Sequence, residues 1–145
     1  MADNTFFPFV GVESDYIPEN NSELPLYKEI AWNFDTDEFI RDEKGDFKIV
    51  EGKEALQVWI YHALHVNRYE HEIFSWDYGT ELIKLIGQRF SKGLTESEAF
   101  RYIKEALLIN EYLTDVRKNS ITFEGDTLHI DITVFTVYGE VRLSV

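Results

Sequence analysis

Hydrophobic and polar positions divide the chain into strand-like runs and two helical runs. Between Leu26 and Val50, apolar residues alternate in short runs separated by polar turns, which predicts short strands. From Glu51 to Val66, apolar residues recur at helical spacing over so broad a face that we expect burial on more than one side. A short helix is expected at 81–86. This order predicts an α+β fold, with a small mixed or antiparallel sheet packed against two main helices.

The second half of the chain supplies the other main helix and the last strands. Thr95-Glu96-Ser97-Glu98 matches a capping box, so a helix is expected to begin there and to run to about Asn110. Strands are then expected at 116–123, 128–137 and 140–145. The last strand leaves a sheet edge near the chain terminus, and such an edge is either protected or used for pairing.

Residues 1–25 differ from the rest of the chain in composition. They carry five acidic residues, no basic residue and all three prolines. We therefore expect an acidic, extended N-terminal arm at 1–25 and a single α+β domain at 26–145. Phe6, Phe7 and Phe9 would anchor the arm on its own domain or on a partner.

Composition and charge exclude several function classes. The 145 residues include 27 acids against 14 bases, which gives a net charge of −13, and no cysteine. Without cysteine there is no disulfide, no thiolate nucleophile and no Cys-ligated metal. Lysine and arginine form no basic stripe for nucleic acid, and no apolar run is long enough to cross a membrane. We therefore expect a soluble, intracellular protein that binds neither nucleic acid nor membrane.

Three histidines are the candidates for a metal site. His62 and His65 lie three residues apart on the first predicted helix, and His71 follows. Neutral imidazoles are common metal ligands, but no glutamate completes an HExxH arrangement here. Ordinary surface or core histidines are the favoured interpretation, so we expect no metal and no cofactor.

Two acid pairs are the candidates for hydrolytic chemistry. Glu70 with Glu72, or Asp77 with Glu81, would supply the two carboxyl groups that glycoside hydrolysis needs. With 27 acids in the chain, such spacings arise by chance. The sequence also has no Walker phosphate loop and no GxSxG elbow, so we expect no catalytic residue.

One segment resembles a known family. Arg68-Tyr69 is followed by Ile73-Phe74-Ser75-Trp76-Asp77-Tyr78-Gly79 and then by a short helical stretch that closes on Leu85-Ile86-Gly87. This order is similar to that of the XkdS-like baseplate proteins of PBSX-type defective prophages, and of related contractile-tailed phages and phage-tail-like bacteriocins. The resemblance covers roughly 27–145. It extends, more distantly, to the lysozyme-like baseplate wedge proteins of large contractile phages.

The resemblance implies a structural, non-enzymatic role as a baseplate wedge or sheath initiator. Such proteins surround the tail tube in about six copies. The implied partners are the tail sheath protein, other baseplate wedge and hub proteins and the tail tube. The implied location is the virion or tail-like particle, and the bacterial host cytoplasm before assembly. The isolated chain is expected to be a monomer or small oligomer.

Two sets of residues are the candidates for partner contacts. The first stands where the wedge proteins carry a Glu-Pro-Arg motif, and the second lies on the last strand, whose edge would pair with a strand of the first sheath ring. They are Arg68, Tyr69 and Glu70, and Glu140, Val141, Leu143 and Val145. Proline at Ile132 or Val141 is expected to remove a ladder donor and stop sheath assembly.

Two other function classes stay open at this point. The acid pairs, with the label of the distant relatives, suggest a peptidoglycan-cleaving, lysozyme-like enzyme. The net charge of −13 suggests an acidic inhibitor that imitates nucleic acid.

Overall fold

The computed structural model describes residues 24–70, 77–85, 92–125 and 127–145. The expected arm at 1–25 therefore lies outside the described residues except for its last two positions. Pro25 is held on the domain, because its carbonyl accepts a hydrogen bond from the Tyr112 hydroxyl at 2.7 Å. Within the described ranges, no helix is both long and apolar enough to span a membrane.

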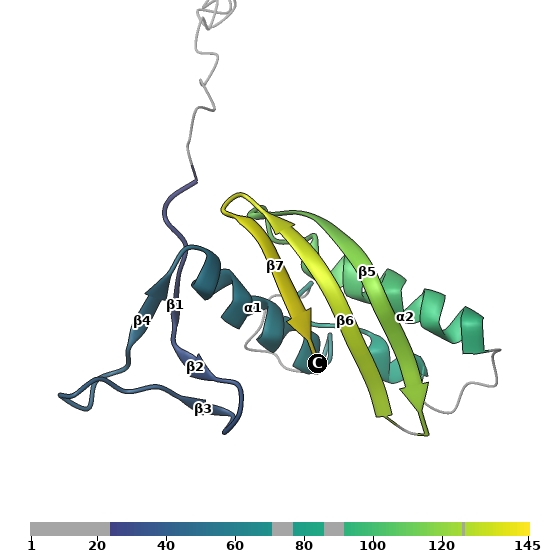
Figure 1. Ribbon diagram of the computed structural model, residues 1–145, viewed down its shortest axis with the longest axis horizontal. Coiled ribbons are helices and arrows are strands. Elements are labelled where there is room, and N and C mark those ends of the chain that lie inside the picture. Colours follow the sequence, from purple (N-terminus) through teal and green to yellow (C-terminus); the bar gives the residue numbers. More distant parts are fainter. Residues whose placement is uncertain (1–23, 71–76, 86–91, 126) are drawn as a thin grey trace, which may run out of the picture.

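Four short strands form a lobe at residues 28–51, which we call the N-terminal lobe. They are β1 (Lys28–Ile30), β2 (Trp32–Asn33), β3 (Glu38–Phe39) and β4 (Ile49–Glu51). β1 pairs with β4 and β2 pairs with β3, both antiparallel. Figure 1 shows this lobe at one end of the molecule, beside the first helix and apart from the larger sheet.

The helix α1 (Lys53–His65) is buried on two sides, as its broad apolar face predicts. Leu56 and Ile60 enter the main core, whereas Val58 joins a smaller cluster with Ala31 and Val50 of the lobe region. The helix starts at Gly52, whose φ of 65° is a conformation that glycine adopts without strain. α1 therefore links the lobe to the rest of the fold.

The other helical segments differ from the prediction at their ends. The short helix is a 3₁₀ helix, η1 (Leu82–Leu85), and α2 spans Lys92–Leu107. The predicted capping box is wrong, because Thr95 lies inside α2. Glu98 does not cap the backbone; its carboxylate accepts a hydrogen bond from Arg101 at 2.8 Å. The helix also ends before Asn110, whose side chain accepts a hydrogen bond from the Tyr112 amide instead.

The last three strands form one antiparallel sheet in the order β5-β6-β7. They are β5 (Leu113–Glu124), β6 (Thr127–Thr136) and β7 (Gly139–Ser144). Figure 1 shows α1 and α2 behind one face of this sheet, while the other face is open. The largest fully buried side chains come from both layers: Leu56, Ile60, Ile103, Leu107, Ile132 and Val134. The α+β class is confirmed.

Truncation of Ile60 tests whether the contact between α1 and the sheet carries the stability of the fold. Ile60 is fully buried, so Ile60→Ala should lower the free energy of unfolding by about 2–5 kcal/mol through lost burial and a residual cavity. Ile83 on η1 is 46% exposed, and Ile83→Ala should change it by less than about 0.5 kcal/mol. Urea denaturation of both variants measures the difference; equal effects would contradict the assignment.

Candidate functional site

The outer strand β7 presents an open backbone edge. Within the described residues it pairs only with β6, in a register that runs without a shift from Thr136 opposite Gly139 to Asp131 opposite Ser144. Beyond it, Ile130 and Val145 exchange both of their backbone hydrogen bonds, at 2.7 and 2.8 Å. In an antiparallel ladder, every second residue exchanges both backbone hydrogen bonds with its partner strand. The N–H and C=O groups of the residues between them point away from that partner strand.

This alternation decides which residues of β7 face outward. Gly139, Val141 and Leu143 share the phase of Val145, so their N–H and C=O groups point toward β6. The backbone groups of Glu140, Arg142 and Ser144 therefore point away from the sheet. Of the four strand residues expected to bind a partner, only Glu140 offers its backbone at this edge.

The side chains of β7 divide cleanly between the two faces of the sheet. Val141 and Leu143 are only 4% and 6% exposed, because their inward face is covered by the core. Val145 is partly buried against the same core, whereas Glu140 and Arg142 are exposed on the open face. The inner side chains of β7 are therefore already packed against the core, while the outward backbone groups of β7 stay available to another strand.

Polar side chains on the open face fasten β7 to its neighbours. Arg142 binds both carboxylate oxygens of Asp131 on β6, at 3.1 and 2.7 Å. From β5, the Asn119 amide donates to Asp131 at 3.0 Å and to Thr133 at 2.9 Å. The hydrogen bond from Arg142, with that from Asn119, lowers the pKa of Asp131 to about 2. The three strands are therefore held together by side chains as well as by backbone.

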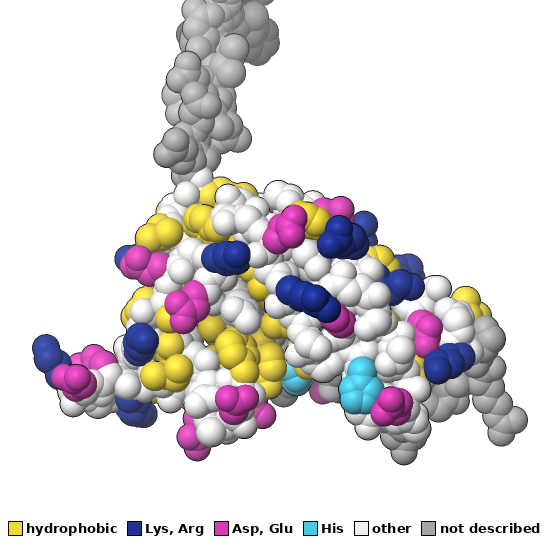
Figure 2. All heavy atoms as spheres, in the orientation of Figure 1, with side chains coloured by type: hydrophobic (Ala, Val, Ile, Leu, Met, Phe, Trp, Pro, Cys, Tyr) yellow, Lys and Arg dark blue, Asp and Glu magenta, His cyan; other side chains and the backbone are white. Residues whose placement is uncertain are grey.

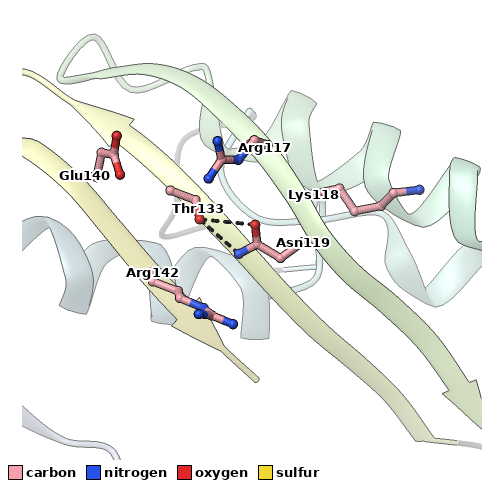
Figure 3. Close-up of a pocket in the computed structure, with 6 residues that line it drawn as sticks. All are labelled: Arg117, Lys118, Asn119, Thr133, Glu140 and Arg142. Carbon is pink, nitrogen blue, oxygen red and sulfur yellow. Dashed lines mark hydrogen bonds between the residues drawn. The ribbon is translucent and has the colours of Figure 1, made fainter.

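A polar pocket lies on this open face, and Figure 3 shows the side chains that line it. Its lining residues are Arg117, Lys118, Asn119, Thr133, Glu140 and Arg142. They include three basic side chains and one carboxylate, Glu140. The face is suited to polar contact with a partner.

The opposite edge of the sheet is less suited to pairing. β5 shows register shifts between Leu113 and Asp115 and between Lys118 and Ser120, which leave Thr114 and Asn119 as extra residues. Such bulges bend a strand, disrupt its ladder and are a common means of protecting an edge. β7 has no such irregularity, so it is the regular edge of the sheet.

The Arg68 segment forms a parallel β-bridge with the Gly79 segment, in which Asn67 lies opposite Thr80. The Thr80 amide donates to the Val66 carbonyl at 2.8 Å, and the Arg68 amide donates to the Thr80 carbonyl at 2.9 Å. A Cβ at Gly79 would lie 2.6 Å from the Val66 carbonyl oxygen, and Gly79 has a φ of +97°. Only glycine fits there without strain. This explains in physical terms why a glycine stands at position 79, opposite the backbone of Val66 and Arg68.

The three candidate residues of this segment do not all face solvent. The Arg68 side chain is 10% exposed and lies 3.9 Å from the Glu81 carboxylate, so it is largely buried beside that residue. Tyr69, with a φ of 69°, and Glu70 are exposed. Glu70 also accepts a hydrogen bond from Asn67 at 3.0 Å. Tyr69 and Glu70 are therefore the members of this set that a partner can reach.

The histidines and acid pairs show no common site within the described ranges. The His62 ring lies edge-on to Trp32 with centroids 4.5 Å apart, and His65 Nδ1 lies 2.7 Å from the Tyr61 carbonyl. The described residues hold no cluster of three metal-binding side chains. His71 and Glu72 lie outside the described residues. The Glu81 carboxylate forms ion pairs with Lys84 and Arg68, which are its partners in the structure instead of Asp77.

A bulge in β5 is the functional feature that the sequence analysis missed. Val116 and Ile121 are both buried but lie five residues apart, an odd spacing that a regular strand would place on opposite faces. The extra residue is Asn119, and the shift turns its amide toward Asp131 and Thr133. The odd spacing of apolar residues was the available signal.

The chain belongs to the family of contractile injection system sheath initiators, whose model matches residues 28–139. It is also similar to the phage-like element PBSX protein XkdS of Bacillus subtilis (strain 168), with 28% identity over 97 residues. That alignment covers 66% of this chain and 69% of the relative. The expected family is confirmed, and with it a structural role in the baseplate of a contractile phage tail or tail-like particle, in association with the sheath.

Substitution of Gly79 tests whether the β-bridge between Asn67 and Thr80 needs a residue without a side chain at position 79. Gly79→Ala should lower the free energy of unfolding by at least about 2 kcal/mol, because the new Cβ meets the Val66 carbonyl and φ is strained. Gly125 has a φ of +61° but open space around it, so Gly125→Ala should cost only about 1 kcal/mol. Thermal and urea unfolding measure both; equal losses would show that φ alone matters.

Titration of Asp131 tests the cross-strand ion pair. Its pKa of about 2 lies below the ordinary 3.8, so the pair stabilises the folded state above pH 3.8 and is lost as the pH falls through 2. In Arg142→Ala the pKa should rise toward 3.8, because the first cause of the shift is removed. Carbon-13 NMR of the side-chain carboxyl measures it, and an unchanged pKa would refute the assignment.

Proposed function

We propose that the first sheath ring docks on this protein by adding a strand to the open edge of β7. One observation carries the proposal: Glu140, Arg142 and Ser144 direct their backbone groups away from a regular strand whose inner side chains are already buried. Strand addition uses such an edge, with the backbone supplying affinity and alternating side chains supplying register. A sheath initiator contacts the sheath, and we assign that contact to this edge.

The faces of β7 indicate which sequence the added strand carries. The side chains of the added strand would alternate between the two faces of the sheet. One set would lie beside Val141 and Leu143 on the core side, and the other beside Glu140 and Arg142 on the open side. Arg142 already holds Asp131, whereas Glu140 has no ion-pair partner among the described residues. We therefore expect a basic residue beside Glu140 and apolar residues on the core side.

The finer aspects of the role belong to the same proposal. Other baseplate wedge proteins, the hub and the tail tube are the proposed further partners, with about six copies in the particle and a monomer or small oligomer in isolation. Tyr69 and Glu70 are the proposed contact toward the baseplate. The proposed role is non-enzymatic; clearing of peptidoglycan in a zymogram by the purified chain would overturn that part.

The edge geometry changes which proline substitution tests the docking. Proline at Ile132 or Val141 would remove an N–H that bonds within the ladder of β6 and β7, so it would damage the protein's own sheet. Proline at Arg142 removes an outward N–H and leaves that ladder intact. An outward position on an edge strand is where a sheet tolerates proline.

Arg142→Pro is the direct test of strand addition. It should reduce the affinity for purified sheath protein by about tenfold or more, because one main-chain hydrogen bond is lost and the ring obstructs the edge. Arg142→Ala is the matched control: it loses the same ion pair but keeps the N–H, so its affinity should stay within about twofold of the wild type. Isothermal calorimetry measures both.

Folding is checked by circular dichroism before binding is measured. If Arg142→Pro does not fold, Ser144→Pro removes another outward N–H nearer the end of the strand. Undiminished binding by a folded proline variant would contradict the proposal, and so would an equal loss in Arg142→Ala, since the side chain would then carry the contact.

A further inference from the structure

The N-terminal lobe exposes a set of large apolar side chains far from the β7 edge in the sequence. The exposed fractions range from 36% to 52% for Phe34, Phe39, Ile40, Phe47 and Ile49. Figure 2 shows hydrophobic side chains gathered over the part of the molecule where Figure 1 places the lobe and α1. Contiguous exposed apolar side chains are unusual on a monomer and mark interaction surfaces.

These side chains are held in a defined arrangement. Phe39 lies edge-on to Trp32 and to Phe47, with ring centroids 4.8 and 5.4 Å apart. The Arg41 guanidinium lies 4.4 Å from the centre of the Phe47 ring. Edge-to-face packing and a cation over a ring fix the aromatic groups in place although the core does not cover them. The lobe therefore offers a preformed aromatic surface, which a partner can bind at low ordering cost.

Acidic residues outnumber basic ones in the lobe that carries this aromatic surface. Residues 28–51 contain eight acids and four bases. Three of the acids, Asp35, Asp37 and Glu38, stand together between Phe34 and Phe39. A partner that covers the aromatic side chains must meet these carboxylates, so electrostatic complementarity favours a cationic one.

The same charges argue against two alternative occupants. Residues 1–23 of this chain carry apolar side chains that would suit the surface, but they hold five acids and no base. A second copy of the chain, at a net charge of −13, is also repelled. Both alternatives bring an acidic segment against the acidic lobe.

We propose that the aromatic surface of the N-terminal lobe binds an apolar, net-positive segment of a different protein of the assembled particle. Phe39 and Phe47 supply the apolar contact, and Asp35 and Glu38 pair with lysine or arginine of the partner. This interface is separate from the edge of β7, so the protein has one surface for backbone pairing and another for side-chain recognition.

Cross-linking in the assembled particle identifies the occupant. The full chain is made with p-benzoylphenylalanine in place of Phe47, incorporated into particles and irradiated, and the cross-linked peptide is sequenced by mass spectrometry. The expected product is a peptide of another particle protein with more basic than acidic residues. The same photoreactive group at Ile109, which is 45% exposed outside the lobe, is the control and should not give that product.

Charge reversal supplies an independent measurement. Glu38→Lys should reduce incorporation of the chain into particles at least tenfold, whereas Glu111→Lys, an exposed acid outside the lobe, should change it less than twofold. Binding of the isolated Glu38→Lys chain to sheath protein should stay unchanged, which separates this interface from that of β7. Circular dichroism confirms that both variants fold.

Several results would overturn the inference. Cross-links from position 47 to residues 1–23, to a second copy, to an acidic peptide or to nothing would each exclude a cationic partner at the lobe. Normal incorporation of Glu38→Lys would exclude the electrostatic part of the interface. Loss of sheath binding in Glu38→Lys would show that the two surfaces are not separate.

Discussion

The two-sided burial of α1 is the constraint on which the rest of the structure depends. One side of the helix places Leu56 and Ile60 in the core beneath the sheet, and the other side packs Val58 against the N-terminal lobe. Because a single helix serves both clusters, the lobe and the sheet are positioned by the same thirteen residues. Loss of either contact would leave one functional surface without its support.

This arrangement explains how an edge strand can be both stable and available. Edge strands are a liability when their side chains and backbone are exposed together, because any extended chain can pair with them. In β7 the core already buries Val141 and Leu143, and Arg142 fastens the strand to Asp131. What stays open is a short backbone edge. Such an edge favours a partner of matching register over unspecific association.

The high negative charge fits the same division of roles. Main-chain pairing at β7 does not depend on net charge, so an acidic chain can still accept a strand there. The side-chain recognition that we propose at the lobe does depend on charge, because the acids that precede Phe39 in the sequence would favour a cationic partner.

Much of the fold could be predicted from the sequence because its signals are local. The two-sided α1 followed from its broad apolar face, and the three late strands followed from alternation. The start of α2 was missed because Thr95 to Glu98 matches a capping box locally, while the helix begins a turn earlier. Two features of the candidate site depend on contacts between segments and could not be predicted from one segment alone. The direction of each β7 amide depends on the pairing with β6. The burial of Arg68 depends on the segment that contains Gly79 and Glu81. The family was recognised from the same segment, although the physical reason for its glycine at position 79 required the structure.

Amide hydrogen exchange of the folded chain, with and without purified sheath protein, tests the central claim most directly. In the free chain, the amides of Glu140, Arg142 and Ser144 should exchange fast, whereas those of Val141 and Leu143 should be protected by their bonds to β6. With sheath protein, the three outward amides should become protected while the inward pair stays protected. Sheath binding that leaves the exchange of all three outward amides unchanged would contradict the account.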